Sequence, residues 1–336
     1  MLLREKISGI HAAKQRAQEE RFMKKQTYVP AEPIVKGRED TFWYVIGERC
    51  ISCGQCAANC PAGAIAEGDD RYLIDPARCI DCGTCSYVCP VQAAQPVCKK
   101  EEPATVCVRE SISIGDIDTD TCYYNPGCAL RAYKPDVPEQ LLQLLRSGLG
   151  EIKRHQICCR HQPGLPDGSV IIGNCAGCDR RFRSLYPGIE TISIWEVLDS
   201  FPSLPLPDYR GLTVSVHDSC AYRHKPQVHR AIRNLLRKMN ITMEEAAFHG
   251  TTSICCGDNL YGHVPNAVVE RRIQERVNQF PCENVVVYCI GCVRAVEFGG
   301  KKPLYMADLL LNRSTESMPD TLDEYHETLQ TYIHSQ

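Results

Sequence analysis

Residues 50–61 read CISCGQCAANCP, and residues 79–90 repeat the pattern as CIDCGTCSYVCP. Each copy has three cysteines separated by two residues, then a fourth cysteine after three more residues and directly before a proline. The eight cysteines are Cys50, Cys53, Cys56, Cys60, Cys79, Cys82, Cys85 and Cys89. The spacing is typical of 4Fe-4S cubane ligation, in which three close thiolates hold one cluster and the fourth reaches the other. Zinc sites use pairs of ligands and are therefore disfavoured.

The interleaved spacing predicts two ligand sets. One set is Cys50, Cys53, Cys56 and Cys89, and the other is Cys79, Cys82, Cys85 and Cys60. Over about 50 residues the block resembles the two-cluster ferredoxins of bacteria, including the YLID segment at residues 72–75. The resemblance implies a ferredoxin module that transfers single electrons, but it does not say to what.

Composition limits the class of protein. A chain of 336 residues suggests two domains. Its 38 Lys and Arg against 41 Asp and Glu give a net charge of -3, which argues against nucleic-acid binding. The N-terminus lacks an apolar signal segment, and the longest apolar run, near residues 285–293, is too short to span a bilayer. We therefore expect a cytoplasmic protein, not itself membrane-spanning, in which the closely spaced members of its 22 cysteines bind metal or clusters.

The chain divides into six segments. We expect residues 1–40 to be a basic helical arm and linker, which is either a solvated segment, a helix packed on its own chain, or a docking site for a partner subunit. The other segments are the ferredoxin block at 41–98, a connector at 99–120, two half-domains at 121–205 and 206–312, and a C-terminal tail at 313–336.

The two half-domains echo one another. Residues 170–178 (VIIGNCAGC) and 285–292 (VVVYCIGC) each read as a buried strand that ends in Cys-x-Gly-Cys. Short apolar helical stretches follow at 194–198 and 305–310. We also predict a strand at 212–217 and helices at 228–239 and 267–277. Strands that alternate with helices indicate α/β half-domains with mainly parallel sheets, related by internal duplication.

The second half-domain contains five chemically important cysteines. They are Cys220, Cys255, Cys256, Cys289 and Cys292. Five thiolates exceed what tetrahedral zinc can use, so the surplus of soft ligands indicates iron–sulfur chemistry. Here the chain resembles the cysteine-rich CCG domain of heterodisulfide reductase and its relatives, and residues 217–220 (HDSC) are similar to the family's His-Asp-Pro-Cys. The resemblance implies that such a five-cysteine site can hold a non-cubane 4Fe-4S cluster.

The first half-domain carries a similar set. Its cysteines are Cys128, Cys158, Cys159, Cys175 and Cys178. Residues 123–128 (YYNPGC) resemble the family's opening Tyr-x-Pro-Gly-Cys. However, Arg160 replaces the glycine of Cys-Cys-Gly, and only 15 residues separate Cys159 from Cys175, against 32 between Cys256 and Cys289. This half could hold a second non-cubane cluster, a cubane or zinc.

The other cysteines, the histidines and the basic residues do not form motifs that specify a role. Four cysteines lie outside these sets: Cys98, Cys107, Cys122 and Cys282. We expect them to be small buried apolar residues, although Cys122 is close enough to Cys128 in sequence to replace a ligand. Candidate proton donors are His217, His224, His229 and His263. Basic residues beside the cysteines, such as Arg180, Arg223 and Arg294, either offset cluster charge or form an anion-binding rim.

The predicted fold class is an α+β ferredoxin module followed by a duplicated α/β cysteine-rich (CCG) domain. The order of the modules resembles the fused form of heterodisulfide reductase, which implies an oxidoreductase subunit of anaerobic metabolism with two cubanes and one or two further 4Fe-4S clusters. Electrons would pass to Cys220, Cys255, Cys256, Cys289 and Cys292, where a disulfide or similar two-electron acceptor is reduced.

We expect the second half-domain to meet the substrate, because Gly257 leaves room beside the paired thiolates. The alternative is a pure electron-transfer subunit that serves a catalytic partner of flavin, corrinoid, molybdenum or membrane type. A metal-dependent sensor or assembly factor is a third class, disfavoured because the chain has no DNA-reading motif.

Overall fold

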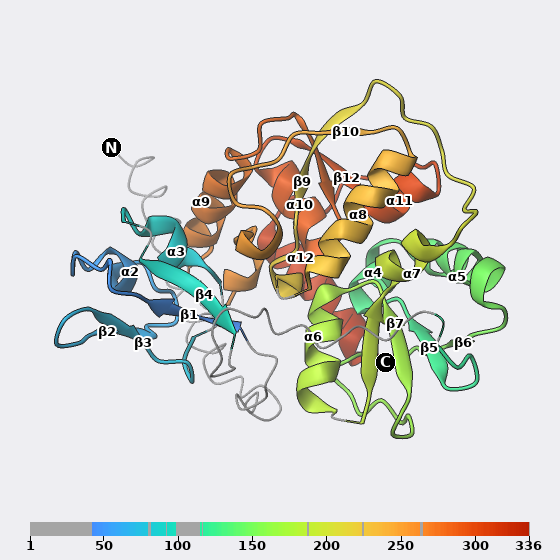
Figure 1. Ribbon diagram of the computed structural model, residues 1–336, viewed down its shortest axis with the longest axis horizontal. Helices are drawn as coiled ribbons and strands as arrows, with labels where there is room; N and C mark the ends of the chain where they lie inside the picture. Colours follow the sequence, from blue (N-terminus) through green and yellow to red (C-terminus); the bar gives the residue numbers. More distant parts are fainter. Residues whose placement is uncertain are drawn as a thin grey trace, which may run out of the picture.

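The computed structural model describes residues 42–335 except 80–81, 92, 99–114, 116, 187, 224 and 263–264. The described residues form a small ferredoxin region beside a larger region with two sheets (Figure 1). The arm at 1–40 and most of the connector at 99–120 lie outside the described residues.

The ferredoxin region contains two short helices and two antiparallel strand pairs. Its strands are β1 (Phe42–Ile46), β2 (Ile65–Glu67), β3 (Tyr72–Ile74) and β4 (Ala94–Cys98), and its helices are α2 (Gln55–Ala58) and α3 (Thr84–Val88). β1 pairs with β4, and β2 pairs with β3. Each helix begins inside a cysteine loop, after a glycine in the left-handed region: Gly54 has φ 74° and Gly83 has φ 79°. The glycines thus allow each loop to turn directly into its helix.

The first sheet is parallel throughout and has the strand order β6-β5-β7-β8. Its strands are β5 (Cys122–Asn125), β6 (Lys153–Arg154), β7 (Val170–Gly173) and β8 (Glu190–Ser193). The helices are α4 (Cys128–Tyr133), α5 (Val137–Leu149), α6 (Ala176–Leu185) and α7 (Ile194–Ser200). A capping box fixes the start of α7, where the Ser193 hydroxyl accepts from the Trp195 amide and Glu196 accepts from the Ser193 amide.

The second sheet is also parallel and has the order β10-β9-β11-β12, which is the same order by position in the chain. Its strands are β9 (Thr213–His217), β10 (Thr242–Met243), β11 (Asn284–Val287) and β12 (Lys302–Tyr305). The helices are α8 (Pro226–Lys238), α9 (Asn266–Val277), α10 (Ile290–Phe298) and α11 (Met306–Leu310). The predicted parallel sheets and the predicted helices at 228–239 and 267–277 are therefore confirmed, within one or two residues.

One core joins the two sheets. It contains Trp195 and Leu198 of α7 together with Ile232 and Leu235 of α8. A buried ion pair, Lys134 Nζ to Asp308 at 2.9 Å, also links the half-domains. The half-domains therefore pack as one continuous body, with no solvent layer between their cores.

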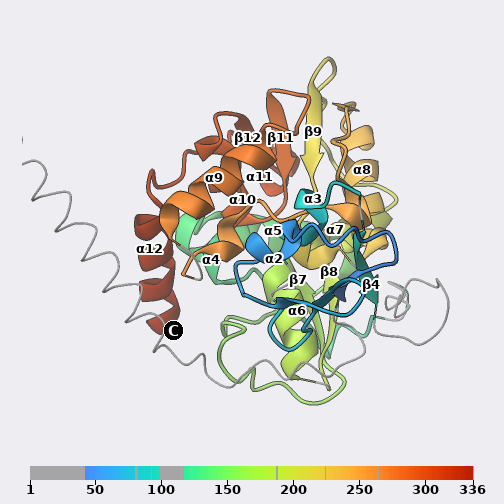
Figure 2. The same ribbon diagram turned by 90° about the vertical axis from the view of Figure 1, so that its left-hand side faces the viewer.

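The C-terminal segment folds back onto this body. Helix α12 (Leu322–His334) packs against α4, and Figure 2 shows it along one edge of the molecule. Leu322, Tyr325 and Ile333 form its buried face. This helix was not predicted, although Leu322, Tyr325, Leu329 and Ile333 recur at helical spacing.

Candidate metal centres

The eight ferredoxin cysteines line two separate hollows. One is lined by Cys50, Cys53, Cys56 and Cys89, together with Tyr72 and Val91. The other is lined by Cys60, Cys79, Cys82 and Cys85, together with Tyr44 and Ile74. These are the two interleaved sets that the spacing predicts. In each loop the fourth cysteine accepts a backbone N–H, from Ala64 at 3.2 Å to Cys60 Sγ and from Ala93 at 3.1 Å to Cys89 Sγ.

The second half-domain brings its five thiols into one row. Side-chain hydrogen bonds join Cys220 to Cys255, Cys255 to Cys256, Cys256 to Cys292 and Cys292 to Cys289. The Cys256–Cys292 Sγ distance is 3.5 Å. Cys220 follows β9 and Cys289 follows β11, so the row lies at the carboxyl edge of the parallel sheet, where ligand sites of such sheets occur.

The first half-domain forms the same kind of row. Hydrogen bonds join Cys128 to Cys158, Cys158 to Cys159, Cys159 to Cys178 and Cys178 to Cys175. The order matches the other row position by position. All five thiols belong to one apolar cluster with Phe182, Ile189 and Ile333. The shorter spacing between Cys159 and Cys175 therefore does not prevent convergence.

Both rows contain thiols whose pKa is lowered. Hydrogen bonds from Cys255 and Cys292 lower the pKa of Cys256 to about 6. In the first row, hydrogen bonds from Cys128 and Cys159 lower the pKa of Cys158. Iron and zinc bind thiolate rather than thiol, so a low pKa prepares a cysteine for ligation.

Gly257 does not leave room beside the thiolates, so that expectation was wrong. Its φ is 111°, and a Cβ atom there would lie 2.9 Å from Cγ1 of Ile273 and 3.1 Å from its amide nitrogen. The glycine is needed because the turn presses against α9. Arg160, at the matching position, has an exposed side chain that donates to Gln330 on α12.

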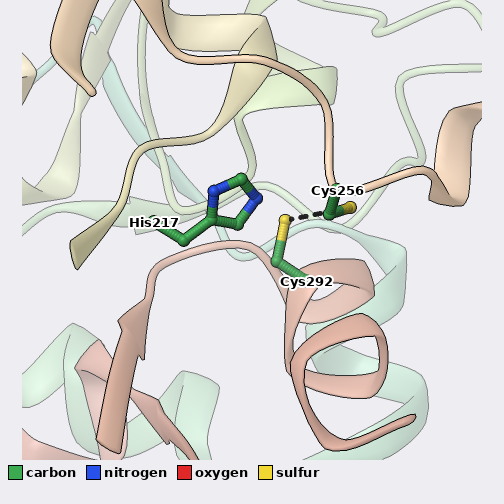
Figure 3. Close-up of side chains that lie close together, drawn as sticks. All are labelled: His217, Cys256 and Cys292. Atoms are coloured by element: carbon green, nitrogen blue, oxygen red, sulfur yellow. Dashed lines mark hydrogen bonds between the residues drawn. The ribbon is translucent and has the colours of Figure 1, made fainter. Parts of the chain in front are cut away.

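His217 lies beside the second row, within 4.8 Å of the Cys256 and Cys292 sulfur atoms (Figure 3). Burial, followed by the charge of Arg276, lowers the pKa of His217 to about 3. Burial likewise lowers the pKa of His229. Both imidazoles are therefore neutral at pH 7, which argues against either as an imidazolium proton donor. His224 and His263 lie outside the described residues.

Sequence reasoning did not single out Arg276 of α9, whose side chain is 2% exposed. Its guanidinium donates to the Phe248 carbonyl and to the Gln279 amide oxygen, and lies 3.4 Å from Nδ1 of His217. None of these three partners carries negative charge. A buried cation needs a compensating anion, and the nearby negative charges that favour the guanidinium are those of Cys256 and, next, of the Asp218 carboxylate. Five soft ligands, three of them buried, beside a buried cation fit an anionic iron–sulfur cluster.

The other basic residues have different roles. Arg223 and Arg180 lower the pKa of Cys220 through their charge, although burial and the Cys255 contact outweigh them. Lys225 forms a buried ion pair of 2.7 Å with Asp179, which links the two half-domains. Arg181 donates to the Cys159 carbonyl. Of these, only Arg223 and Arg180 influence a thiol of the second row.

The ferredoxin region lies against the second half-domain near Cys82 of the former and Cys255 of the latter. A hollow between them is lined by Cys82, Gly83 and Thr84 on one side and by Ile254, Cys255 and Arg276 on the other. A Cβ atom on Gly83 would lie 3.3 Å from Cγ2 of Ile254, the neighbour of Cys255. Arg272 of α9 donates to Asn59 at 2.8 Å, and Arg223 lies over the ring of Tyr44. Figure 1 shows α3 beside α9.

Helix α12 contacts both thiol rows. Tyr325 stacks on Tyr133 and its hydroxyl lies against Gly291, between Cys289 and Cys292. Cys175 of the first row also lies close enough to raise the pKa of Tyr325, after burial, Asp258 and Cys289. Nearby, Nε2 of His326 forms a hydrogen bond of 3.1 Å with the Asp258 carboxylate. At the other end of the helix, His161 bonds to the Ile333 carbonyl.

Two of the other four cysteines have described surroundings. Cys122 begins β5, at the end of the strand away from Cys128, and is fully buried in the main core. Burial raises its pKa to about 11, as expected for an apolar residue rather than a ligand. Cys282 is partly exposed, and its amide donates to Ser215. The side chain of Cys98 and the whole of Cys107 lie outside the described residues.

Comparison with known proteins agrees with both kinds of centre. The family model of the 4Fe-4S dicluster domain matches residues 49–93. The chain contains a 4Fe-4S dicluster ferredoxin domain. A second model, of the cysteine-rich CCG domain, matches residues 214–297, which include all five thiols of the second row.

Curated relatives cover the ferredoxin domain. The 4Fe-4S ferredoxin FdxA of Gottschalkia acidurici is 66% identical over 32 residues, which are 10% of this chain and 57% of that protein. A ferredoxin of Acetoanaerobium sticklandii is 62% identical over 34 residues, 10% of this chain and 61% of that protein. Ferredoxin Fdx2 of Sorangium cellulosum is 39% identical over 66 residues, 19% of this chain and 65% of that protein. The chain thus spans about three-fifths of the length of these relatives. Among the described residues, no helix is long and apolar enough to span a bilayer.

Proposed function

We propose that the ferredoxin domain passes electrons to the second half of the cysteine-rich domain, where a disulfide or similar two-electron acceptor is reduced. The protein would be an oxidoreductase component similar to the fused form of heterodisulfide reductase. The observation that carries the proposal is that Cys82 and Gly83 of the ferredoxin region line the same hollow as Ile254 and Cys255. One thiol of a ferredoxin set therefore shares this hollow with the second thiol of the second row.

Cysteines of the chain would hold the redox centres, and other residues line the space between them. The two ferredoxin sets would each hold a cubane, and the row from Cys220 to Cys289 would hold a further 4Fe-4S cluster. When bound, such clusters supply one-electron redox centres. Ile254, Leu260 and Arg276 line the space between the two domains, so the charge of Arg276 lies between the ferredoxin sets and the second row.

The second row is the better candidate for chemistry. It lies beside Arg276 and His217, whereas the first row has Arg160 at its exposed margin. We also infer that the two half-domains arose by duplication, because they share the strand order and the linkage order of the five thiols. The first row would then hold a second cluster, a cubane or zinc.

The experiment is iron, sulfide and zinc analysis with EPR on protein purified without oxygen. Two cubanes give eight irons, so about 12–16 irons per chain would support one or two further clusters. Oxidised glutathione or cystine added to the reduced protein should change the EPR signal of the second row. Eight irons with zinc, or a signal that no disulfide affects, would contradict the proposal.

The second candidate is a pure electron relay to a catalytic partner. It is favoured by burial, because Cys255, Cys256 and Cys292 are each at most 9% exposed. Isolation from the native source separates the two candidates. A stable complex in which a flavin, corrinoid, molybdenum or membrane subunit carries out the catalysis would favour the relay.

A further inference from the structure

The imidazole of His217 has one nitrogen whose partner is missing. Nε2 is fully buried and makes no hydrogen bond among the described residues, although the side chain is only 1% exposed. Figure 3 shows the ring nitrogen farther from the Cβ atom turned toward the sulfur atoms of Cys256 and Cys292. A buried imidazole nitrogen without a partner costs free energy comparable to a lost hydrogen bond. The position therefore requires a functional explanation.

Arg276 decides which nitrogen carries the proton. Its guanidinium can only donate, and it lies 3.4 Å from Nδ1 of His217. Nδ1 must then be the acceptor, which leaves the hydrogen on Nε2. Nε2, on the sulfur side, is consequently a hydrogen-bond donor. A protonated Nε2 has no free lone pair with which to bind iron.

The first half-domain offers an internal comparison. Asn125 ends β5 as His217 ends β9, and each residue stands three positions before the first cysteine of its row. The Asn125 amide is fully used, because it bonds to His155 at 2.8 Å and to the Ile157 carbonyl at 3.1 Å, and accepts from the Gly127 amide. Only the second half-domain directs an unused donor from this position toward its thiols.

We propose that His217 donates a hydrogen bond from Nε2 to a sulfur atom of the second row, either a thiolate of Cys256 or Cys292 or a sulfide held between them. The bond stabilises the more negative, reduced state and so raises the reduction potential of this centre. Arg276 is a positioning residue, because it fixes the tautomer and adds positive charge. The inference rests on the proposed function, since it requires an iron–sulfur cluster at this row.

The direct test uses wild-type holoprotein in which histidine carries ¹⁵N. Pulsed EPR of the reduced second-row centre should show a weak ¹⁵N coupling and an exchangeable proton, both absent in His217→Phe. A strong coupling, typical of a directly bonded nitrogen, would overturn the proposal, as would no coupling at all. Absence of any centre at the second row would instead contradict the proposed function.

Potentiometry supplies the second readout. His217→Phe should lower the equilibrium constant for reduction about tenfold, equal to about 59 mV for one electron. His217→Gln retains an N–H donor and should recover part of that change. His229→Phe is the matched control. His229 is also buried in this half-domain, but it lies outside the cluster formed by His217, Cys256 and Cys292. Equal potentials in wild type and His217→Phe, with iron retained, would refute the role.

Discussion

The two halves of the cysteine-rich domain have the same skeleton but different surroundings at their thiols. Both place five cysteines at the carboxyl edge of a four-stranded parallel sheet of the same order. The second row has a buried arginine, a histidine donor and the ferredoxin domain beside it. The first row has an asparagine with satisfied bonds and an exposed arginine. The comparison teaches that the fold supplies the ligands, whereas neighbouring residues decide what a bound centre can do.

The largest expected effect tests which row does the chemistry. Cys256→Ala should abolish disulfide reduction, because Cys256 is the middle thiol of the row beside the ferredoxin domain. Cys159→Ala, the same change in the first row, should mainly lower metal content or stability. Turnover with a reduced low-potential donor and metal analysis would measure both. Equal loss of activity, with the remaining clusters intact in each variant, would favour a site shared between the halves.

The next effect tests whether the second row receives electrons through the ferredoxin domain. Cys53→Ala should destroy one cubane, because Cys53 belongs to the first ligand set. In rapid-freeze EPR, we expect a protein donor to reduce the second row slowly. A strong chemical reductant should reduce it at the normal rate. Loss of every cluster at once would show that the two domains do not fold independently.

A third effect concerns the joint between the halves. Asp179→Ala should destabilise the protein by about 3–5 kcal/mol, because it leaves the buried Lys225 ammonium without its carboxylate. Asp199→Ala is the matched control, since its partner Lys238 is 42% exposed, and it should cost at most about 1 kcal/mol. Anaerobic urea unfolding measures both. Similar midpoints would mean that the buried pair does not hold the halves together.

The smallest effects compare the residues that follow the cysteine pairs. Gly257→Ala should cost about 1–3 kcal/mol, because of its positive φ and its contact with Ile273. Arg160→Ala should change stability by no more than about 0.5 kcal/mol, since the side chain is exposed. Thermal unfolding of both variants tests the difference. A Gly257→Ala protein as stable as wild type would show that the turn can relax.

Much of the fold was accessible from local patterns. The cysteine spacing indicated the ferredoxin domain, and alternating apolar strands and helices predicted two parallel sheets. The bounds of α8 and α9 were close because their apolar faces repeat at helical spacing. Helix α12 was missed, although its apolar residues Leu322, Tyr325, Leu329 and Ile333 also recur at helical spacing. What the fold adds is the surface that this helix covers, which consists of α4 and the thiol rows.

The sequence by itself determined the number and spacing of the cysteines, from which the metal ligands are predicted, because these are properties of the chain. Only the tertiary structure decided which row faces the ferredoxin domain and which carries a buried cation. Arg276 lies 56 positions after Cys220 and 16 before Cys292, with no motif to mark it. Its proximity to His217 arises from the packing of α9 against the second sheet. Electrostatic effects act through space over a few ångströms, so their origin is visible only once the chain has folded.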